Sequence, residues 1–160
     1  MPLVSKILLT LLAALSLSAH ARYDGEDRGK PVMPAQVNAK FQQECAGCHL
    51  AFPPGLLPAA SWRKVMTGLD KHFGADASLA PAEVTEITDF LVKNASNRWT
   101  ASTAPLRITE SSWFKSKHNE REIAPAVWQR ASIKSPSNCS ACHAGADKGN
   151  FNEHSIKIPK

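Results

Sequence analysis

Apolar residues recur at helical spacing in the first half of the chain. Steps of four residues join Val37, Phe41 and Cys45, which predicts a helix over 35–44 with these residues on one face. Ser61 suits the N-cap of a second helix. The inward face predicted for this second helix consists of Trp62, Val65, Met66, Leu69 and Phe73, just before a chain-reversing Gly74.

The remaining pattern predicts three further helices. One covers 81–94, where a proline opens a run of apolar residues at helical spacing. Another begins after Ser111 or Ser112, either of which can cap it, and carries His118. A short helix is predicted over 123–131. No segment alternates apolar and polar residues for long enough to predict a strand, so the expected fold class is mainly α.

Polar segments divide the chain into two small units. Residues 22–34 are polar and contain glycines and prolines, which predicts a flexible arm. The polar stretch 96–109 is the predicted linker between a first unit, 35–95, and a second unit, 110–160. Within the first unit, 50–58 holds three prolines and a glycine and is therefore expected to be a loop.

Residues 1–21 have the features of a cleaved signal peptide. Lys6 supplies a positive charge, an apolar run follows over 7–17, and Ala19-His20-Ala21 matches the small-x-small cleavage pattern. The apolar run is shorter than the roughly 20 residues needed to span a bilayer. We therefore expect a mature chain that starts at Arg22, has no transmembrane segment and lies in the periplasm.

All four cysteines lie in two copies of one motif. Cys45-Ala46-Gly47-Cys48-His49 and Cys139-Ser140-Ala141-Cys142-His143 both read C-x-x-C-H, the signature of c-type haem attachment. Two thiols at this spacing can add to the two vinyl groups of a haem, and the adjacent histidine can supply an axial nitrogen to its iron. The sequence therefore predicts two covalently bound haem c groups, attached to Cys45, Cys48, Cys139 and Cys142, with His49 and His143 as ligands.

Other uses of paired cysteines fit the sequence less well. A thioredoxin-like redox pair follows a strand and precedes a helix, and neither motif has that setting. A four-cysteine zinc site usually has about 15–20 residues between its pairs, whereas 90 residues separate Cys48 from Cys139. Two structural disulfides would suit an oxidising compartment, but they give no reason for the histidine that follows each pair.

Haem groups also account for the composition. The 160-residue chain is 43% hydrophobic and 21% charged, as in globular proteins, but only 7% aromatic. Two large apolar haems would supply the core that few aromatic side chains can build. Their propionates would also offset the formal charge of +5, so we expect no nucleic-acid partner.

The second axial ligand of each iron must come from the remaining side chains. A carbonyl near Pro53 or Pro54 is expected to accept the ring N–H of His49 and fix its orientation. The candidates for the opposite positions in the mature chain are Met33, Met66, His72, His118 and His154.

Met66 and His72 point about 120° apart on a helix, so both cannot face one iron. Met66 lies mid-face and suits the core, whereas His72 beside Gly74 is favoured as the ligand of the first haem. No methionine follows Met66. His118, in a basic segment, is favoured for the second haem over His154, which lies in a polar tail.

These motifs together resemble the bacterial dihaem cytochrome c family over nearly all of residues 32–159. The resemblance rests on His49 followed by Leu50-Ala51-Phe52-Pro53-Pro54-Gly55-Leu56-Leu57-Pro58, then Trp62, Lys71-His72-Phe73-Gly74, Lys117-His118, Ser135-Pro136-Ser137-Asn138-Cys139 and Ile156-Lys157-Ile158-Pro159. It implies bis-histidine haems, with His72 and His118 as the distal ligands. It also implies electron transfer to a small oxygen-binding mono-haem cytochrome, the sphaeroides haem protein, with membrane cytochrome b-type donors.

The expected architecture is thus two small c-type haem-binding helical units, the first of which is like a mono-haem cytochrome c. The expected function is periplasmic electron transfer at low potential, because methionine ligation, which raises the potential, is not expected at either haem. Two alternatives stay open. One is the dihaem electron-transfer subunit of a periplasmic nitrate reductase, and the other is a haem enzyme with one open iron.

Overall fold

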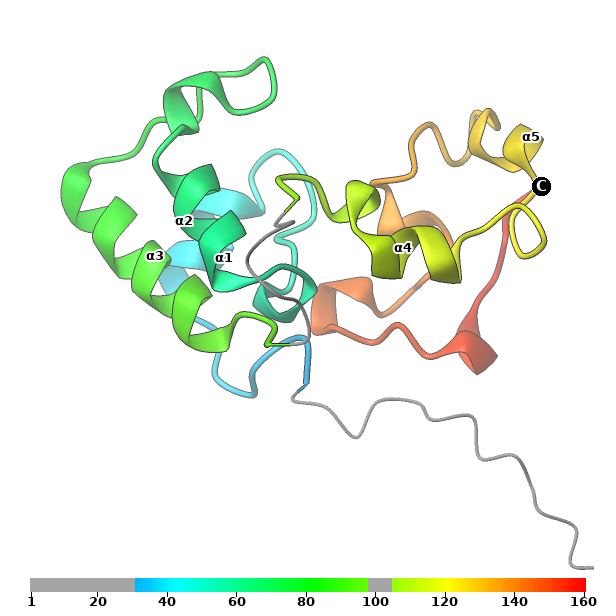
Figure 1. Ribbon diagram of the computed structural model, residues 1–160, viewed down its shortest axis with the longest axis horizontal. Coiled ribbons are helices and arrows are strands. Elements are labelled where there is room, and N and C mark those ends of the chain that lie inside the picture. The colour runs from blue at the N-terminus through cyan, green and yellow to red at the C-terminus, as the bar shows by residue number, and fades with distance from the viewer. Residues whose placement is uncertain (1–30, 98–104) are drawn as a thin grey trace, which may run out of the picture.

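The computed structural model describes residues 31–97 and 105–160. The predicted signal peptide, most of the predicted arm and the middle of the predicted linker lie outside the described residues. The described part forms two groups of short helices that lie side by side along the long axis of the molecule (Figure 1). We call residues 31–97 the first half and residues 105–160 the second half. Among these residues, no helix has the length and apolar character needed to cross a bilayer.

The first half is built from three helices, α1 (Ala39–Cys45), α2 (Ala59–Met66) and α3 (Pro81–Asn94). Helix α3 packs against both α1 and α2, and its bounds confirm the predicted helix over 81–94. The buried residues between these helices form the main core, which consists of Phe41, Ala51, Leu57, Trp62, Met66, Ile87 and Leu91.

Helix α1 begins later than the sequence pattern predicts. Asn38 is its N-cap, and the Asn38 side chain accepts a hydrogen bond of 2.7 Å from the backbone N–H of Phe41. The helix therefore starts at Ala39 rather than at residue 35. Val37 falls before the cap and is 40% exposed, so its predicted inward position is wrong. Phe41 is buried as expected.

Helix α2 begins two residues before the predicted cap and is shorter than predicted. Pro58 is its N-cap, and the Pro58 carbonyl accepts from the N–H groups of Ser61 and Trp62. Ser61 is therefore a buried residue of the first turn rather than the cap. The helix ends at Met66, two residues before Gly68. Glycine is unfavourable in the interior of a helix.

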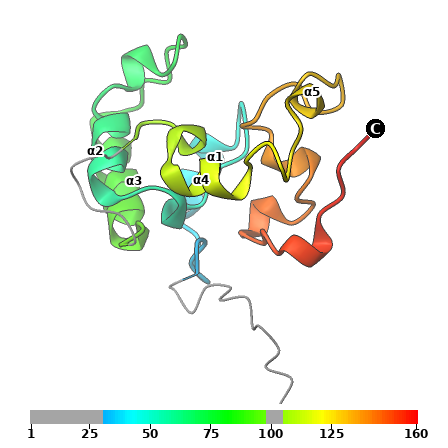
Figure 2. The same cartoon turned by 45° about the vertical axis from the view of Figure 1, so that its right-hand side comes forward.

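The second half has two short helices and several single turns of 3-10 helix. Helix α4 covers Ser112–Lys117, and the Ser111 side chain caps it as predicted by accepting from the N–H of Phe114. Helix α5 covers only Pro125–Trp128, so the predicted helix over 123–131 is too long. Helix α4 lies on the side of the second half that faces the first (Figures 1 and 2).

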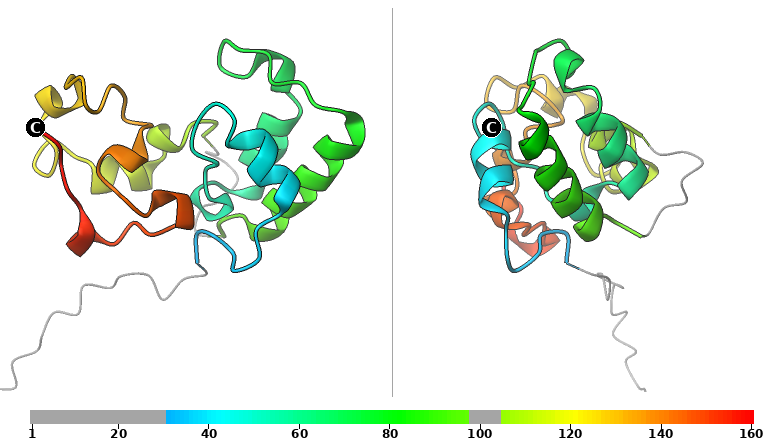
Figure 3. Two further views of the ribbon diagram at one scale, coloured as in Figure 1. Left: turned by 180° about the vertical axis from the view of Figure 1, so that it is seen from behind. Right: turned by 90° about the vertical axis from the view of Figure 1, so that its left-hand side faces the viewer.

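A segment near the start of the described chain is built into both halves. Met33 is buried, and the N–H of Gly55 donates to the carbonyl of Val32 at 2.8 Å. A Cβ added to Gly149 would lie 2.6 Å from the Cβ of Met33. Figure 3 shows this segment running beside the turn that contains residues 146–148. The last residues of the predicted arm 22–34 thus pack between the two halves.

Candidate functional site

The first half holds a cavity of about 860 Å³ that is lined by the first motif. Cys45, Cys48 and His49 contribute to its wall, and His72 contributes from the loop that follows α2. The apolar part of the lining includes Phe52, Leu57, Trp62, Met66 and Leu91. Its volume falls within the roughly 300–1,000 Å³ of cofactor pockets.

The imidazole rings of His49 and His72 lie close to each other in this cavity. Their centroids are 6.1 Å apart, and the ring planes differ by 20°. The Nδ1 atom of His49 lies 2.7 Å from the carbonyl oxygen of Leu50, so Nδ1–H donates there and Nε2 is left for a ligand. The expected carbonyl near Pro53 or Pro54 does not have this role, because the carbonyl of Pro54 accepts from Trp62 Nε1 at 2.7 Å.

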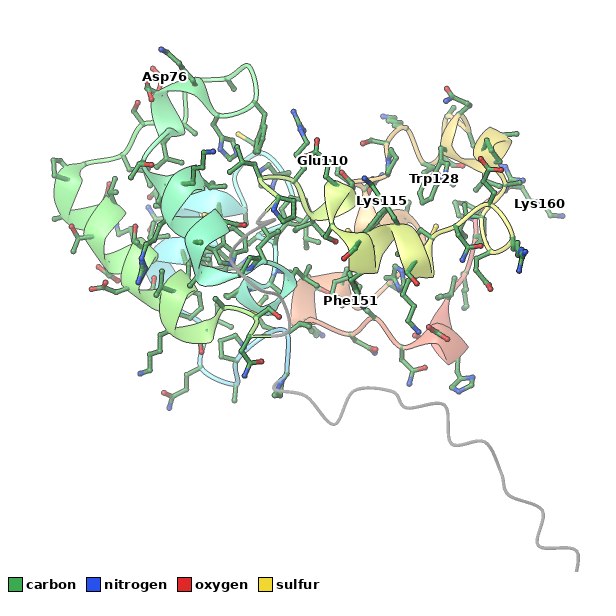
Figure 4. The ribbon with its side chains drawn as sticks, viewed as in Figure 1. Asp76, Glu110, Lys115, Trp128, Phe151 and Lys160 are labelled. Atoms are coloured by element: carbon green, nitrogen blue, oxygen red, sulfur yellow. The ribbon has the colours of Figure 1, made fainter. Side chains whose placement is uncertain are left out.

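A tight chain reversal places His72 in the cavity. His72 follows a 3-10 turn, Leu69–Lys71, rather than lying in the last turn of a long α2. Phe73 and Gly74 then both adopt positive φ, +51° and +101°, and the N–H of Ala75 donates back to the carbonyl of His72 at 3.0 Å. Asp76, labelled in Figure 4, lies on the limb that returns beside the 3-10 turn, where the N–H of Ala77 donates to the carbonyl of Leu69 at 2.8 Å. Phe73 is 46% exposed and lines the first cavity, but it does so from this loop and not from a helical face as predicted.

The second half holds a cavity of about 610 Å³ lined by the second motif. Cys139, Cys142 and His143 contribute to its wall, and His118 contributes from the end of α4. The rings of His118 and His143 have centroids 6.2 Å apart, with 67° between their planes. His154, by contrast, is exposed and lines neither cavity.

The two histidines of the second cavity are held differently. His118 is the C-cap of α4, its Nδ1 lies 3.0 Å from the carbonyl oxygen of Phe114, and its ring stacks on the Phe114 ring. The Nδ1 of His143 is buried and has no hydrogen-bond partner in the described part of the chain. Instead, the Phe151 ring packs against the His143 ring in an edge contact, with centroids 5.3 Å apart. Trp128, labelled with Phe151 in Figure 4, lies 6.1 Å from the His118 ring.

The C-terminal tail, residues 151–160, covers one side of the second cavity. Ile156 and Ile158 line the cavity. The backbone N–H of Lys157 donates to the carbonyl of Cys142 at 3.1 Å. Farther along, Arg130 donates to the carbonyl of Pro159 at 2.7 Å and Ser132 donates to that of Lys160. Several separate hydrogen bonds therefore hold the tail in place.

One wall is common to the two cavities. Ile108, Phe114, Asn138 and Cys139 line both of them. The second motif therefore begins at the boundary of the first cavity, and side chains of α4 and of the turn before it separate the two spaces. Groups bound in the two cavities would be close neighbours.

Burial sets the protonation of the side chains in both cavities. It lowers the pKa of His72, His118 and His143, so their imidazoles are neutral at pH 7, the form that binds metal ions. Burial also raises the pKa of the Cys45 and Cys139 thiols to about 11. Neither thiol therefore has the lowered pKa of a redox-active cysteine.

The alternative cysteine sites find no support in the described residues. All four thiols are free. No group of three or more His, Cys, Asp or Glu side chains in this part of the chain is arranged to hold a metal ion.

The paired imidazoles fit a haem iron between them. An imidazole nitrogen binds a metal ion such as zinc at about 2.0–2.1 Å. Since that nitrogen lies about 1.1 Å from the ring centre, two rings on opposite sides of one ion have centroids about 6.2–6.4 Å apart. The observed separations are 6.1 Å and 6.2 Å. Each pair also lies in a cavity of cofactor size beside two thiols, so the residues present fit two haem groups.

Sequence reasoning missed the residues that hold the predicted ligands in place. Arg107, inside the predicted linker, lies over the Phe73 ring with 4.1 Å between its Cζ and the ring centroid. The tail anchors Arg130 and Ser132 were not expected either. Because these contacts join residues far apart in the chain, no local sequence pattern predicts them.

Comparisons with known proteins support two haem groups. The family model described as dihaem cytochrome c matches residues 41–151. A diheme cytochrome c from Rhodobacter sphaeroides is 41% identical with a TM-score of 0.66, and the match covers 72% of this chain and 97% of that one. A crystal structure of the protein purified from the same organism is 45% identical with a TM-score of 0.64, over 72% and 98% of the two chains.

A third solved structure comes from another genus. The diheme cytochrome type c from Shewanella baltica OS155 is 38% identical with a TM-score of 0.67, and the match covers 76% of this chain and 93% of that one. No curated protein matches the chain.

Proposed function

Because the chain belongs to the dihaem cytochrome c family, we propose that it is a low-potential electron carrier of the periplasm with two histidine ligands to each haem iron. Membership of this family implies two haem c groups and electron transfer. The observation that carries the finer proposal is the pairing of His49 with His72 and of His118 with His143 at separations that suit one metal ion each.

Eight residues hold the two haems in this proposal. Cys45 and Cys48 would attach the first haem and Cys139 and Cys142 the second, while His49, His72, His118 and His143 would supply nitrogen ligands to the two irons. When bound, the haems would supply reversible one-electron oxidation and reduction of iron. Two imidazole ligands to each iron would leave no open position for a small molecule such as oxygen.

The chain's own residues tune these sites. The carbonyls of Leu50 and Phe114 accept from His49 and His118, which fixes the two ring orientations and raises the basicity of these ligands. Apolar side chains make up much of the lining of both cavities and would limit the contact of bound haems with water. Imidazole on both sides of the iron, in place of methionine, supports reduction potentials that are low for a cytochrome c.

The compartment and the partners are further parts of the proposal. A signal peptide over 1–21 would deliver the chain to the periplasm. The resemblance described above suggests a small oxygen-binding mono-haem cytochrome as acceptor and a membrane cytochrome b-type protein as donor. Lys115 and Arg121, exposed beside His118, are candidates to steer an acidic partner, whereas Lys117 is ion-paired with Glu153 at 2.7 Å.

Neither alternative function has a specific observation in its favour. An enzyme with one open iron requires a cavity with a single histidine, and both cavities contain an opposed pair. The family match is to dihaem cytochrome c, which does not single out a nitrate reductase subunit.

Histidine substitution in the holoprotein tests the ligand assignment. His118→Ala should convert one low-spin haem to high-spin and allow rapid carbon monoxide binding there. His154→Ala is the matched control and should leave both haems low-spin, because His154 is exposed and lines neither cavity. If the two variants behave the other way round, the second haem has a different ligand from the one proposed.

A further inference from the structure

Arg107 reaches from the start of the second half to the loop that carries His72. Its guanidinium lies over the Phe73 ring, with Cζ 4.1 Å from the ring centroid. Both Arg107 and Phe73 line the first cavity. A cation placed over an aromatic face is attracted by the electron density of the ring.

Phe73 needs such support, because its backbone conformation is unfavourable. Its φ of +51° is in the left-handed region, which bulky residues rarely adopt. Phe73 is 46% exposed to solvent and to the first cavity, so the protein's own side chains cover only part of it. The following Gly74 also has positive φ, and a Cβ built there would meet nothing within 4 Å. The reversal is therefore only loosely packed at this point.

Phe73 in turn touches the predicted ligand. Its ring meets the His72 imidazole in an edge-to-face contact, with centroids 4.9 Å apart and 63° between the planes. The carbonyl of Leu50 orients the His49 ring through a hydrogen bond. Within the described structure, no such hydrogen bond orients the His72 ring. A chain of ring contacts thus runs from Arg107 through Phe73 to His72.

Arg107 also has an acidic neighbour in the second half. Glu110 lies 3.8 Å from Arg107 Nε and helps to hold the guanidinium in place. Both side chains of this ion pair are half exposed, so the electrostatic contribution is screened by water.

We propose that Arg107 is a positioning residue for His72: by clamping Phe73 over the chain reversal, it holds the distal ligand of the first haem in its coordinating position. This role rests on the proposed function, because it requires His72 to be a ligand. It also means that a residue outside the first unit controls a ligand inside that unit.

The test uses the rate at which carbon monoxide binds the reduced holoprotein. Carbon monoxide reaches a bis-histidine iron only after one histidine has left, so the rate reports the population with His72 released. Arg107→Gln should bind carbon monoxide about two- to five-fold faster at the first haem, since an exposed cation–π contact contributes about 0.5–1 kcal/mol. Phe73→Leu should have an effect of similar size.

Three further variants make the result specific. Combining Arg107→Gln with Phe73→Leu should give no more than the larger single effect, because both act through one contact. Arg107→Lys keeps a cation and should restore most of the wild-type rate. Arg63→Gln is the control, because Arg63 is exposed on α2 and lines neither cavity.

His72→Ala should abolish one low-spin electron paramagnetic resonance signal. That signal then identifies the first haem in the spectra of all these variants. If that signal is lost in His72→Ala but Arg107→Gln and Phe73→Leu keep wild-type rates and line shapes, the positioning role is wrong and the ligand assignment stands. If the low-spin signals survive His72→Ala, the ligand assignment is wrong and the positioning role falls with it. Thermal unfolding of each variant distinguishes a local effect from general destabilisation.

Discussion

Phe114 holds His118 in two ways at once. Its carbonyl oxygen lies 3.0 Å from His118 Nδ1, and its ring stacks on the imidazole with centroids 4.0 Å apart and 10° between the planes. The two residues are one helical turn apart in sequence, so α4 supplies both the ligand and its support. Phe114 also lines both cavities, which places this support on the wall between them.

Substitutions of Phe114 should separate its two contacts. Phe114→Leu keeps the backbone hydrogen bond but removes the stacking, so we expect a broader low-spin signal from the second haem and a small loss of stability. Phe114→Ala should cost about 3 kcal/mol in the free energy of unfolding, because the side chain is buried. Denaturant unfolding and electron paramagnetic resonance of the holoprotein measure these effects. Val37→Ala, at an exposed site, is the control.

The packing of Met33 between the halves predicts an unequal response to alanine at two glycines. Gly149 and Gly74 both have positive φ, but only at Gly149 would a Cβ meet another residue, Met33, at 2.6 Å. Gly149→Ala should therefore destabilise the protein clearly more than Gly74→Ala, which carries only the backbone strain of about 1 kcal/mol. Equal midpoints in thermal unfolding would show that Met33 does not pack tightly there.

Loss of the tail anchors should expose the second cavity. Arg130→Gln combined with Ser132→Ala removes the hydrogen bonds to the carbonyls of Pro159 and Lys160. We expect faster hydrogen exchange at the tail, including the Lys157 N–H that is bonded to Cys142. Mass spectrometry of the C-terminal peptide measures this rate. Arg121→Gln is the charge-matched control, and an equal change in that variant would contradict the anchoring.

Steering by Lys115 and Arg121 predicts a rate that depends on salt. Electron transfer to an acidic partner should slow as ionic strength rises, because the Debye length falls to about 10 Å at 0.1 M. Lys115→Glu should slow the reaction further at low salt, while Lys64→Glu on α2, in the other half, should have a smaller effect. Stopped-flow mixing across salt concentrations gives these rates. If the rates of the wild type, Lys115→Glu and Lys64→Glu do not depend on salt, steering is wrong and the partner docks through apolar contacts.

The sequence predicted those features that depend on residues close together in the chain. Helix α3 has a proline at its start and a regular apolar face, and it was predicted at its observed bounds. The Ser111 cap was also predicted, because the cap and the N–H that it binds are three residues apart. The two C-x-x-C-H motifs predicted two haem groups for the same reason.

Features that depend on distant contacts were wrong or missed. The Pro54 carbonyl was expected to orient His49, but the buried Nε1 of Trp62 takes it, and Leu50 supplies the carbonyl instead. Phe73 fitted a helical face in sequence, whereas the helix ends at Met66 and Phe73 lies in the loop that follows. The periodicity of apolar residues cannot show where a helix ends when packing against distant residues determines that end.

The low-temperature electron paramagnetic resonance spectrum of the oxidised holoprotein, followed through a redox titration, tests most directly whether both irons have two histidine ligands. Opposed imidazoles in both cavities predict two low-spin signals, no high-spin signal, and two midpoint potentials in the low range for cytochromes c. A high-spin signal from one haem, or a potential as high as that of a methionine-ligated cytochrome c, would contradict bis-histidine ligation.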